Sequence, residues 1–216
     1  MSPTRSIEPA RSASLPRWAA LSAALTPVGM IGGWTLAAAL QGPGFDAIRD
    51  TISALAAQSA AAPSIMTAGL ALTGVGHLAT AVALRPAALA GRLLLGAGGV
   101  ATVLVAALPV DASPGAHGIA AAVGFGALSI WPAAASRRGA TGVLSPRVGA
   151  LATGALLALL AWFVVELQHL AADGGTRTGL AERAVAGVQS IWPLLVVVAL
   201  LAAREAVRPT APPVTR

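Results

Sequence analysis

Six long apolar runs alternate with short polar segments along this chain. The charge-free runs cover residues 18–45, 51–84, 93–110, 112–136, 148–165 and 184–203. A bilayer-spanning helix needs roughly 20 mostly apolar residues, and each run reaches that length with a few flanking residues. The pattern predicts transmembrane helices at about 18–40, 62–84, 91–109, 115–135, 147–170 and 180–203. We therefore predict an all-α integral membrane bundle of six helices, in one domain covering residues 17–204.

Arginines in the connecting segments predict how this bundle is oriented. Eleven lie on one side of the predicted membrane, and only Arg49, Arg177 and Arg183 lie on the other. Positively charged loops remain in the cytoplasm, so both termini are predicted to be cytoplasmic and the protein to lie in the inner (cytoplasmic) membrane. The segments 1–16 and 205–216 are rich in Pro, Ser, Thr and Arg, and we expect them to be disordered cytoplasmic tails.

Composition agrees with a membrane protein and excludes several kinds of site. The 216 residues are 56% hydrophobic and 10% charged, whereas a soluble domain has about 25% charged residues. The absence of Cys excludes disulfides, thiolate catalysis and thiolate metal sites. The net charge of +6 comes from arginines spread over the membrane-flanking loops, so we expect a lipid bilayer as the partner and no nucleic acid. The pattern predicts no oligomeric state.

The first outer loop, residues 41–61, is long and carries a second helical pattern. Residues 47–57 suit a short amphipathic helix in the outer interface, because Ile48, Ile52 and Leu55 would share one face. The polar residues of the segment fall largely on the other face and are Asp46, Arg49, Asp50 and Ser53. A lid over a helix bundle would have this pattern.

Ionisable residues gather at the predicted outer ends of the helices. Such residues are costly in a membrane span and are therefore candidates for function. Loop 1, the turn before the fourth helix and the ends of the last two helices bring them to one membrane depth. The set is Asp46, Arg49, Asp50, Ser53, Asp111, His117, Glu166, His169, Glu182 and Arg183.

Three kinds of chemistry fit this outer cluster, and no cofactor is specified. Glu166 and His169, at i and i+3, could bind one metal ion, with His117 and Asp111 completing a set that suits zinc. The second is a polar network in which Glu166 pairs with Arg183 or Arg49. The third is acid–base chemistry without metal, in which a half-buried carboxyl is the acid and His117 the base. Ser53 is then the best-placed hydroxyl.

Two further candidates lie deeper in the predicted bundle. His77 is in the second helix, beside Gly74 and Gly76, which let a neighbouring helix come close. Either its ring bonds to a backbone carbonyl or a Ser/Thr hydroxyl, or it belongs to a substrate or proton pathway. Trp192 lies within the sixth helix, away from the interfacial belts that ordinarily hold tryptophan, and could line a pocket.

Four separated motifs carry a resemblance to a known family. They are Ile52–Ala57 after the Asp46 loop, Gly69–His77, Pro109–Asp111 followed by His117, and Gly179–Arg183 before Trp192-Pro193. Over about residues 20–203 the chain resembles the bacterial membrane family catalogued as domain of unknown function 998. The Ile-Ser-x-Leu loop is also similar to that of the DRAM and Sfk-like six-span proteins. The first resemblance implies six transmembrane helices and an outer polar site, with no assigned reaction.

We predict a multi-pass membrane protein whose outward-facing polar pocket binds a lipid or small amphiphile. One alternative is an intramembrane enzyme acting on a lipid or isoprenoid. It would be a metal-dependent hydrolase using Glu166, His169, His117 and Asp111, or an acid-initiated terpene cyclase, against which the five Trp, three Phe and no Tyr count. A small transporter is the second alternative, against which the lack of a convincing internal repeat counts.

Overall fold

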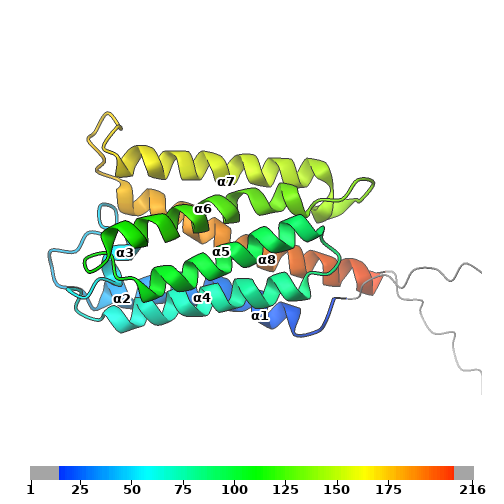
Figure 1. Ribbon diagram of the computed structural model, residues 1–216, viewed down its shortest axis with the longest axis horizontal. Helices are drawn as coiled ribbons and strands as arrows, with labels where there is room; N and C mark the ends of the chain where they lie inside the picture. The colour runs from blue at the N-terminus through cyan, green and yellow to red at the C-terminus, as the bar shows by residue number, and fades with distance from the viewer. Residues whose placement is uncertain (1–14, 207–216) are drawn as a thin grey trace, which may run out of the picture.

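The computed structural model describes residues 15–206, and Figure 1 shows that these fold into a bundle of long helices. Six helical stretches are long and apolar enough to cross a membrane, namely Ala19–Ala39, Pro63–Ala83, Leu89–Ala107, Pro114–Ala135, Pro146–Leu167 and Thr178–Ala206. No strand occurs among these described residues. The predicted all-α fold with six spans is confirmed, and most helix ends fall within two residues of the predicted positions.

The first span is interrupted, and the others are continuous. It consists of α1 (Ala19–Pro27), a π-helical turn η1 (Val28–Gly32) and α2 (Gly33–Ala39). The other spans are α4 (Pro63–Ala83), α5 (Leu89–Ala107), α6 (Pro114–Ala135), α7 (Pro146–Leu167) and α8 (Thr178–Ala206). Two short helices, α3 (Ile52–Leu55) and the 3₁₀ turn η2 (Gly142–Leu144), lie in the connections.

Several helix starts follow from local sequence. α4, α6 and α7 each begin at a proline, where the missing N–H removes no helical hydrogen bond and the fixed φ suits a helix. At α7 the Ser145 hydroxyl also accepts a hydrogen bond from the Val148 amide at 3.4 Å, which caps one of the free N–H groups.

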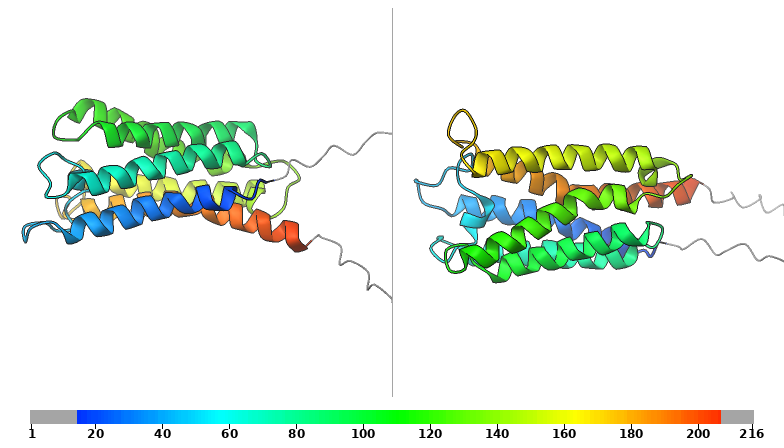
Figure 2. Two further views of the ribbon diagram at one scale, coloured as in Figure 1. Left: turned by 90° about the horizontal axis from the view of Figure 1, so that it is seen from below. Right: turned by 45° about the horizontal axis from the view of Figure 1, so that its top comes forward.

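Consecutive spans pack side by side, and α1 packs against α8, so the six spans close into a ring (Figure 1). The two further views in Figure 2 show the same neighbours. Across the ring, α8 makes only limited contact with α4 and α6. A cavity lies in the interior between these helices, and residues of α4, α5, α6 and α8 line it.

The π-helical turn in the first span lets two backbones meet closely. A Cβ at Gly29 would lie 2.6 Å from the Gly69 carbonyl oxygen of α4, so only glycine fits this crossing. Pro27 and the π turn interrupt the regular bonding, and the Thr73 hydroxyl, which donates to the Gly69 carbonyl oxygen at 2.8 Å, also lies 3.2 Å from the Thr26 carbonyl oxygen. A polar group is thus placed beside a buried backbone carbonyl within the membrane span, and Met30 of the π turn lines the bundle interior.

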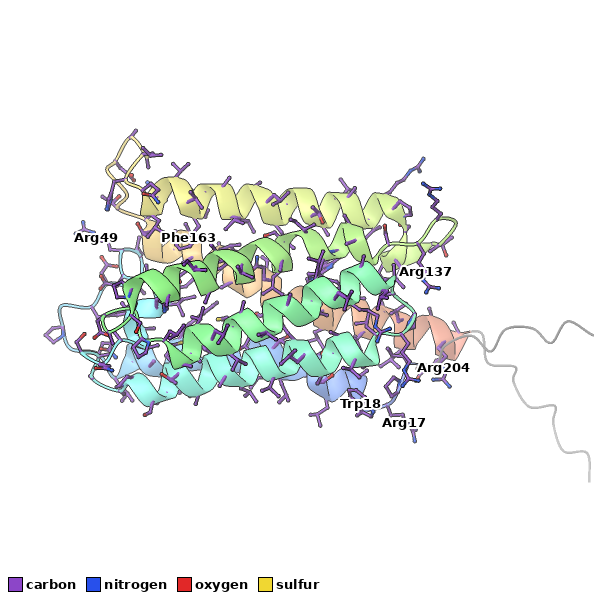
Figure 3. All side chains as sticks on the ribbon, in the orientation of Figure 1. Arg17, Trp18, Arg49, Arg137, Phe163 and Arg204 are labelled. Atoms are coloured by element: carbon purple, nitrogen blue, oxygen red, sulfur yellow. The ribbon has the colours of Figure 1, made fainter. Side chains whose placement is uncertain are left out.

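The two ends of the bundle differ in charge. Arg17, Arg137 and Arg204 lie at the end where the described chain starts and stops, whereas Arg49 lies at the end that holds α3 (Figure 3). We call these the terminal end and the α3 end. The predicted tails 1–16 and 205–216 lie mostly outside the described residues. Within them Leu15 is buried, and Glu205 belongs to α8.

Loop 1 contains a shorter helix than the sequence predicted. Only Ile52–Leu55 is helical, because Asp46 and Asp50 bond the backbone of the preceding turn. The Ile48 amide donates to Asp46 Oδ1 and the Asp46 amide to Asp50 Oδ2, both at 2.8 Å, which favours a turn over a helix. Ile48 is consequently exposed, whereas Ile52 and Leu55 are buried and fix α3 to the bundle.

Candidate functional site

The start of α8 binds loop 1 through its backbone. The first N–H groups of a helix have no partner within it. Here the Gly179 amide donates to the Arg49 carbonyl at 3.1 Å, and the Leu180 amide donates to the Ile48 carbonyl at 2.9 Å. A Cβ at Gly179 would lie 2.8 Å from the Ala47 carbonyl oxygen. Glycine is therefore required for loop 1 to lie this close to α8.

Arg183 strengthens the same attachment. Its Nη1 donates to the carbonyl oxygens of Ala47 and Asp50 at 2.8 Å each, and to that of Gly179 at 3.0 Å. Its guanidinium also lies 5.9 Å from the centroid of the Phe45 ring. Arg183 thus holds loop 1 on α8 and makes no ion pair with Glu166, which the sequence offered as its partner.

Asp111 fixes the far part of loop 1. Its two carboxylate oxygens accept from the Gln58 and Ser59 amides at 3.0 Å each. The hydrogen bond from the Gln58 amide is the main reason that the pKa of Asp111 lies below its ordinary value, with the Ser59 amide adding to it. Arg183 binds the part of loop 1 before α3, and Asp111 binds the part after it. The segment predicted as a lid is therefore attached to the bundle on both sides of α3.

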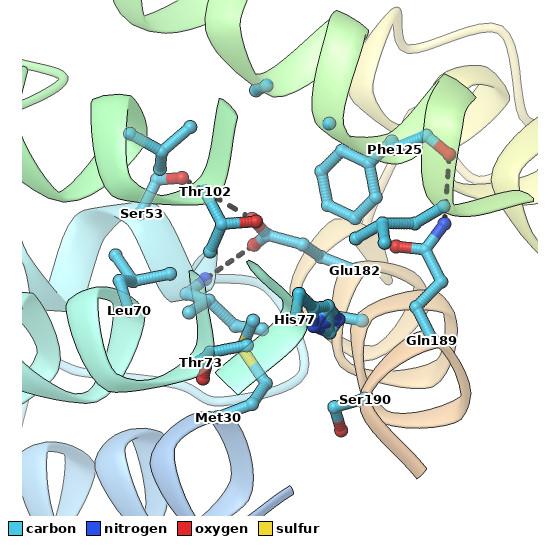
Figure 4. A pocket seen from close by; sticks show the side chains of 16 residues that line it. Met30, Ser53, Leu70, Thr73, His77, Thr102, Phe125, Glu182, Gln189 and Ser190 are labelled. Carbon is cyan, nitrogen blue, oxygen red and sulfur yellow. Dashed lines mark hydrogen bonds between the residues drawn. The ribbon is translucent and has the colours of Figure 1, made fainter. Parts of the chain in front are cut away.

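Glu182 connects this segment to the bundle interior. It is 4% exposed, and its Oε2 accepts from the Ile52 amide, the first N–H of α3, at 2.5 Å. Its Oε1 lies 3.4 Å from the Ser53 hydroxyl oxygen. Figure 4 shows both contacts converging on the carboxylate. A buried carboxylate thereby caps a helix that starts 130 positions earlier in the chain.

Ser53 also touches His117 of α6. Its Oγ lies 3.0 Å from His117 Nε2, and His117 Nδ1 lies 2.7 Å from the Leu108 carbonyl oxygen. A carbonyl oxygen only accepts, so Nδ1 carries the proton. In a neutral ring Nε2 is then the acceptor, and the Ser53 hydroxyl donates to it. Residues from α3, α6 and α8 thus form one run of polar contacts, in which the single Ser53 proton lies between His117 Nε2 at 3.0 Å and the more distant Glu182 Oε1 at 3.4 Å.

A cavity lies beneath α3, between α4, α5, α6 and α8. The space between its lining atoms is about 550 Å³, of which about 50 Å³ can hold the centre of a water-sized molecule. Ser53 and Glu182 line it, and Met30, Leu70 and Phe125 supply apolar wall. A water needs roughly 10–15 Å³ of such central space, so the cavity is narrow but holds more than one small group.

His77 of α4 lines the cavity and is fully buried, yet neither ring nitrogen has a hydrogen-bond partner among the described residues. Of the two interpretations left open by the sequence, the bonded histidine is therefore not observed. Gln189 of α8, also in the lining, donates to the Phe125 carbonyl at 2.9 Å and to the Ser129 hydroxyl at 3.0 Å. Figure 4 shows His77, Glu182 and Gln189 around the same cavity.

Glu166 and His169 lie outside this site, in the connection between α7 and α8. Glu166 accepts from Trp162 Nε1 at 3.2 Å and from the Arg177 amide at 3.0 Å. His169 has a left-handed backbone with φ 56° and contacts the Gly174 carbonyl through Nδ1 at 2.9 Å. Within residues 15–206, no three His, Asp or Glu side chains come together as a metal site would require. Glu166 and His169 instead belong to a turn after α7, in which the His169 amide donates to the Glu166 carbonyl oxygen at 3.0 Å.

The remaining candidates also lie apart from the cavity. Asp46 and Arg49 form an exposed ion pair at 3.7 Å, and Asp50 bonds its own turn. Trp192 packs against the apolar core at the terminal end and is absent from the cavity lining. Of the predicted site residues, the structure therefore brings Ser53, His77 and Glu182 to the cavity, with His117 bonded to the first.

A family model described as "Protein of unknown function (DUF998)" matches residues 19–199. The chain belongs to the DUF998 family. The match spans α3 and five of the transmembrane stretches fully, so the resemblance seen in the sequence motifs is confirmed. No curated protein and no solved structure matched the chain. With its six apolar helices, this DUF998 protein is a multi-pass membrane protein.

Sequence reasoning did not single out several cavity residues of this DUF998 protein, among them Gln189. A signal for it was present, because Glu182, Ala186 and Gln189 follow one another at i, i+4 and i+7 and so share a helix face. Gln189 is also an amide within a charge-free apolar run, where a polar side chain is expensive. That face of α8 lines the cavity.

Proposed function

We propose that this protein binds a small amphiphile or lipid in the cavity beneath α3, with the α3 end facing outward from the inner membrane. One observation carries the proposal. His77 is wholly buried among apolar helices, and neither ring nitrogen has a partner within the described part of the chain. An unpaired buried polar group costs about 1–3 kcal/mol, and a bound molecule with a hydroxyl or carbonyl group would remove that cost.

The walls of the cavity fit such a molecule. Ser53 and Glu182 lie toward α3, and His77 and Gln189 lie deeper, while Met30, Leu70 and Phe125 lie between them. Ligand sites are typically apolar clefts with a few placed polar groups. The limited central space of about 50 Å³ favours a small molecule over a bulky one.

The other functions considered have less support. A metal-dependent hydrolase needs ligands that meet, and Glu166, His117 and Asp111 each bond to a different backbone segment. A terpene cyclase needs aromatic walls, and Phe125 is the one aromatic residue of the cavity lining. A transporter needs access from both ends, whereas the half toward the terminal end is filled by a core that includes Trp131 and Val197.

The test is to identify molecules that co-purify with the full-length protein in detergent. Two neighbouring alanines of α6 provide matched variants, because Ala121 lines the cavity and Ala122 is exposed on the outer face of the helix. We expect native mass spectrometry to find a near-stoichiometric small amphiphile in the wild type. It should fall at least tenfold in Ala121→Phe and persist in Ala122→Phe.

Two outcomes would contradict the proposal. The first is a wild-type protein, purified in a mild detergent, that carries no bound small molecule. The second is an Ala121→Phe variant that folds, with an unchanged unfolding temperature, and retains the ligand in full. Either result would mean that the cavity is a packing defect and that the unpartnered His77 is tolerated without a ligand.

A further inference from the structure

We propose that Ser53 is the nucleophile, and His117 the general base, of an acyl-transfer reaction on a carboxylic ester held in the cavity. The inference rests on the binding function proposed above and adds a reaction class to it. Nucleophilic serine catalysis requires a base within hydrogen-bond reach of the hydroxyl and a third group that orients the base. The structure contains this arrangement at the junction of α3 and α6.

The contacts of His117 match the required roles. Nε2 lies 3.0 Å from the Ser53 hydroxyl oxygen, within the range for proton transfer. The Leu108 carbonyl, 2.7 Å from Nδ1, holds the proton on that nitrogen and fixes the ring orientation. The free lone pair of Nε2 therefore points at the hydroxyl proton, as a base must.

Ser53 differs from every other hydroxyl in the cavity lining. Thr73, Thr102 and Ser190 each donate to a carbonyl oxygen of their own helix, at 2.8 Å in each case. Their protons are thus engaged in helix bonding. Ser53 makes no bond to its own helix; its hydroxyl lies 3.0 Å from the His117 imidazole, 3.4 Å from Glu182 Oε1, and lines the cavity. The remaining histidines offer no equivalent pair, since His77 has no partner among residues 15–206 and His169 contacts a backbone carbonyl.

The position of Ser53 is fixed by the fold. The Glu182 carboxylate accepts the Ile52 amide, and Asp111 binds the amides of Gln58 and Ser59. The backbone on both sides of Ser53 is therefore anchored, to α8 before it and to the α5–α6 connection after it. Such anchoring is what a catalytic group needs, because a displacement of about 1 Å can reduce a rate by two orders of magnitude.

The reaction needs only the ester and water in addition to Ser53 and His117. Ser53 Oγ forms a bond to the ester carbonyl carbon, and its proton passes to His117 Nε2. The bond from that carbon to the alcohol oxygen breaks, and the alcohol leaves with the proton from His117. Water then attacks the acyl-serine with His117 again as base, which releases a carboxylic acid and restores Ser53. The limited volume of the cavity favours an ester of a small acyl group.

A fluorophosphonate probe tests the proposal directly, because it reacts covalently with an activated serine hydroxyl and releases fluoride. The full-length protein would be treated in detergent micelles and mapped by peptide mass spectrometry. We expect one adduct, on Ser53, and none on the exposed Ser59 six positions later in the same loop. Ser53→Ala should lose the adduct, and His117→Ala should slow its formation by about 100-fold, the usual scale of general-base catalysis.

Added imidazole distinguishes a base from a merely structural histidine. It should restore a measurable part of the labelling in His117→Ala, because a free base can occupy the vacated space. An adduct on Ser53 that forms at the wild-type rate in His117→Ala would overturn the proposal. So would a folded wild type that leaves Ser53 unlabelled.

The two proposals fail differently. The co-purified amphiphile and the Ser53 adduct are measured separately on the wild-type protein. A wild-type protein that holds the amphiphile but leaves Ser53 unlabelled would retain the binding function and remove acyl transfer. A wild type with neither the amphiphile nor the adduct would remove both.

Discussion

Two buried glutamates lie at the α3 end of the bundle, and their surroundings differ. Glu166 near the end of α7 and Glu182 near the start of α8 are each 4% exposed. Glu166 bonds to Trp162, one turn earlier, and to the Arg177 amide, 11 positions later. Glu182 bonds to Ile52 and Ser53, about 130 positions earlier, and lines a cavity.

The difference shows that burial alone does not mark a functional carboxylate. Glu166 satisfies donors of its own helical hairpin, and its carboxylate has no contact with the cavity lining. Glu182 brings together α3, α8 and the Ser53 hydroxyl at the edge of the cavity. A group that joins distant segments around a cavity is a stronger candidate for function than one that closes a local turn.

The largest effect is expected for Glu182→Ala. This change leaves the buried Ile52 amide without an acceptor and frees α3 from α8. We expect the free energy of unfolding to fall by about 3 kcal/mol and the co-purified amphiphile to fall at least tenfold. Thermal unfolding in detergent and native mass spectrometry would measure the two effects.

Glu182→Gln is the matched control, because its amide oxygen can still accept from Ile52. It should lose about 1 kcal/mol of stability and keep α3 in place. If Glu182→Ala retains the amphiphile at the wild-type level, Glu182 is a structural cap like Glu166, and the contrast between the two carboxylates disappears.

A somewhat smaller effect is expected for Gly179→Ala, which separates loop 1 from α8. The new Cβ would overlap the carbonyl oxygens of Asp50 and Ala47. Overpacking of this kind costs about 1–3 kcal/mol, and α3 should shift with loop 1, so bound amphiphile should decrease as well. Gly115→Ala, which meets nothing within 4 Å in the first turn of α6, should change neither property.

The spans themselves were predictable from the sequence. A membrane helix needs only a long apolar run, and flanking signals such as Pro63, Pro114 and Pro146 mark where each run starts. These determinants are local, so a single sequence contains them. The helix in loop 1 was less predictable, because the Asp46 and Asp50 side chains compete with helical bonding in a way that hydrophobic periodicity does not reveal.

The site was predictable in its members but not in its pairing. The sequence singled out Ser53, His117 and Glu182 as polar residues at one membrane depth. It could not show that the first of these touches the other two, because that depends on the rotation of α6 and α8 about their axes. It offered Glu166 with His169 as one possible metal pair, since an i, i+3 spacing is visible in one helix. The cavity, which depends on all the helices together, had no local signature.

A still smaller effect is expected for Glu166→Gln, which tests the other side of the comparison. The amide oxygen can accept from either Trp162 or Arg177 but not from both, so the unfolding free energy should fall by about 1 kcal/mol. The amphiphile and the Ser53 adduct should both remain at wild-type levels. Loss of either one in a folded Glu166→Gln protein would make the α7–α8 connection part of the site.

The smallest expected effect is on how the unfolding temperature depends on acid pH. It tests the attachment of loop 1 to Asp111. The Gln58 amide lowers the pKa of Asp111 below its ordinary value of 3.8, so the unfolded chain binds a proton more readily than the folded one. The contribution of Asp111 to stability is therefore complete above that ordinary value and is lost as the pH falls through the lower, folded-state pKa. The unfolding temperature of the wild type should drop on acidification through this range, and that of Asp111→Asn should drop less.

Asp173→Asn separates the two regions in the same experiment. The pKa of Asp173 is also lowered, chiefly by the Thr176 hydroxyl, but this residue lies in the α7–α8 connection. Both variants should lose part of the acid dependence, yet only Asp111→Asn should release the loop that carries Ser53. We therefore expect hydrogen exchange of the Gln58 and Ser59 amides to rise in Asp111→Asn and to stay unchanged in Asp173→Asn. Equal exchange in both would mean that Glu182 and Arg183 alone hold α3 over the cavity.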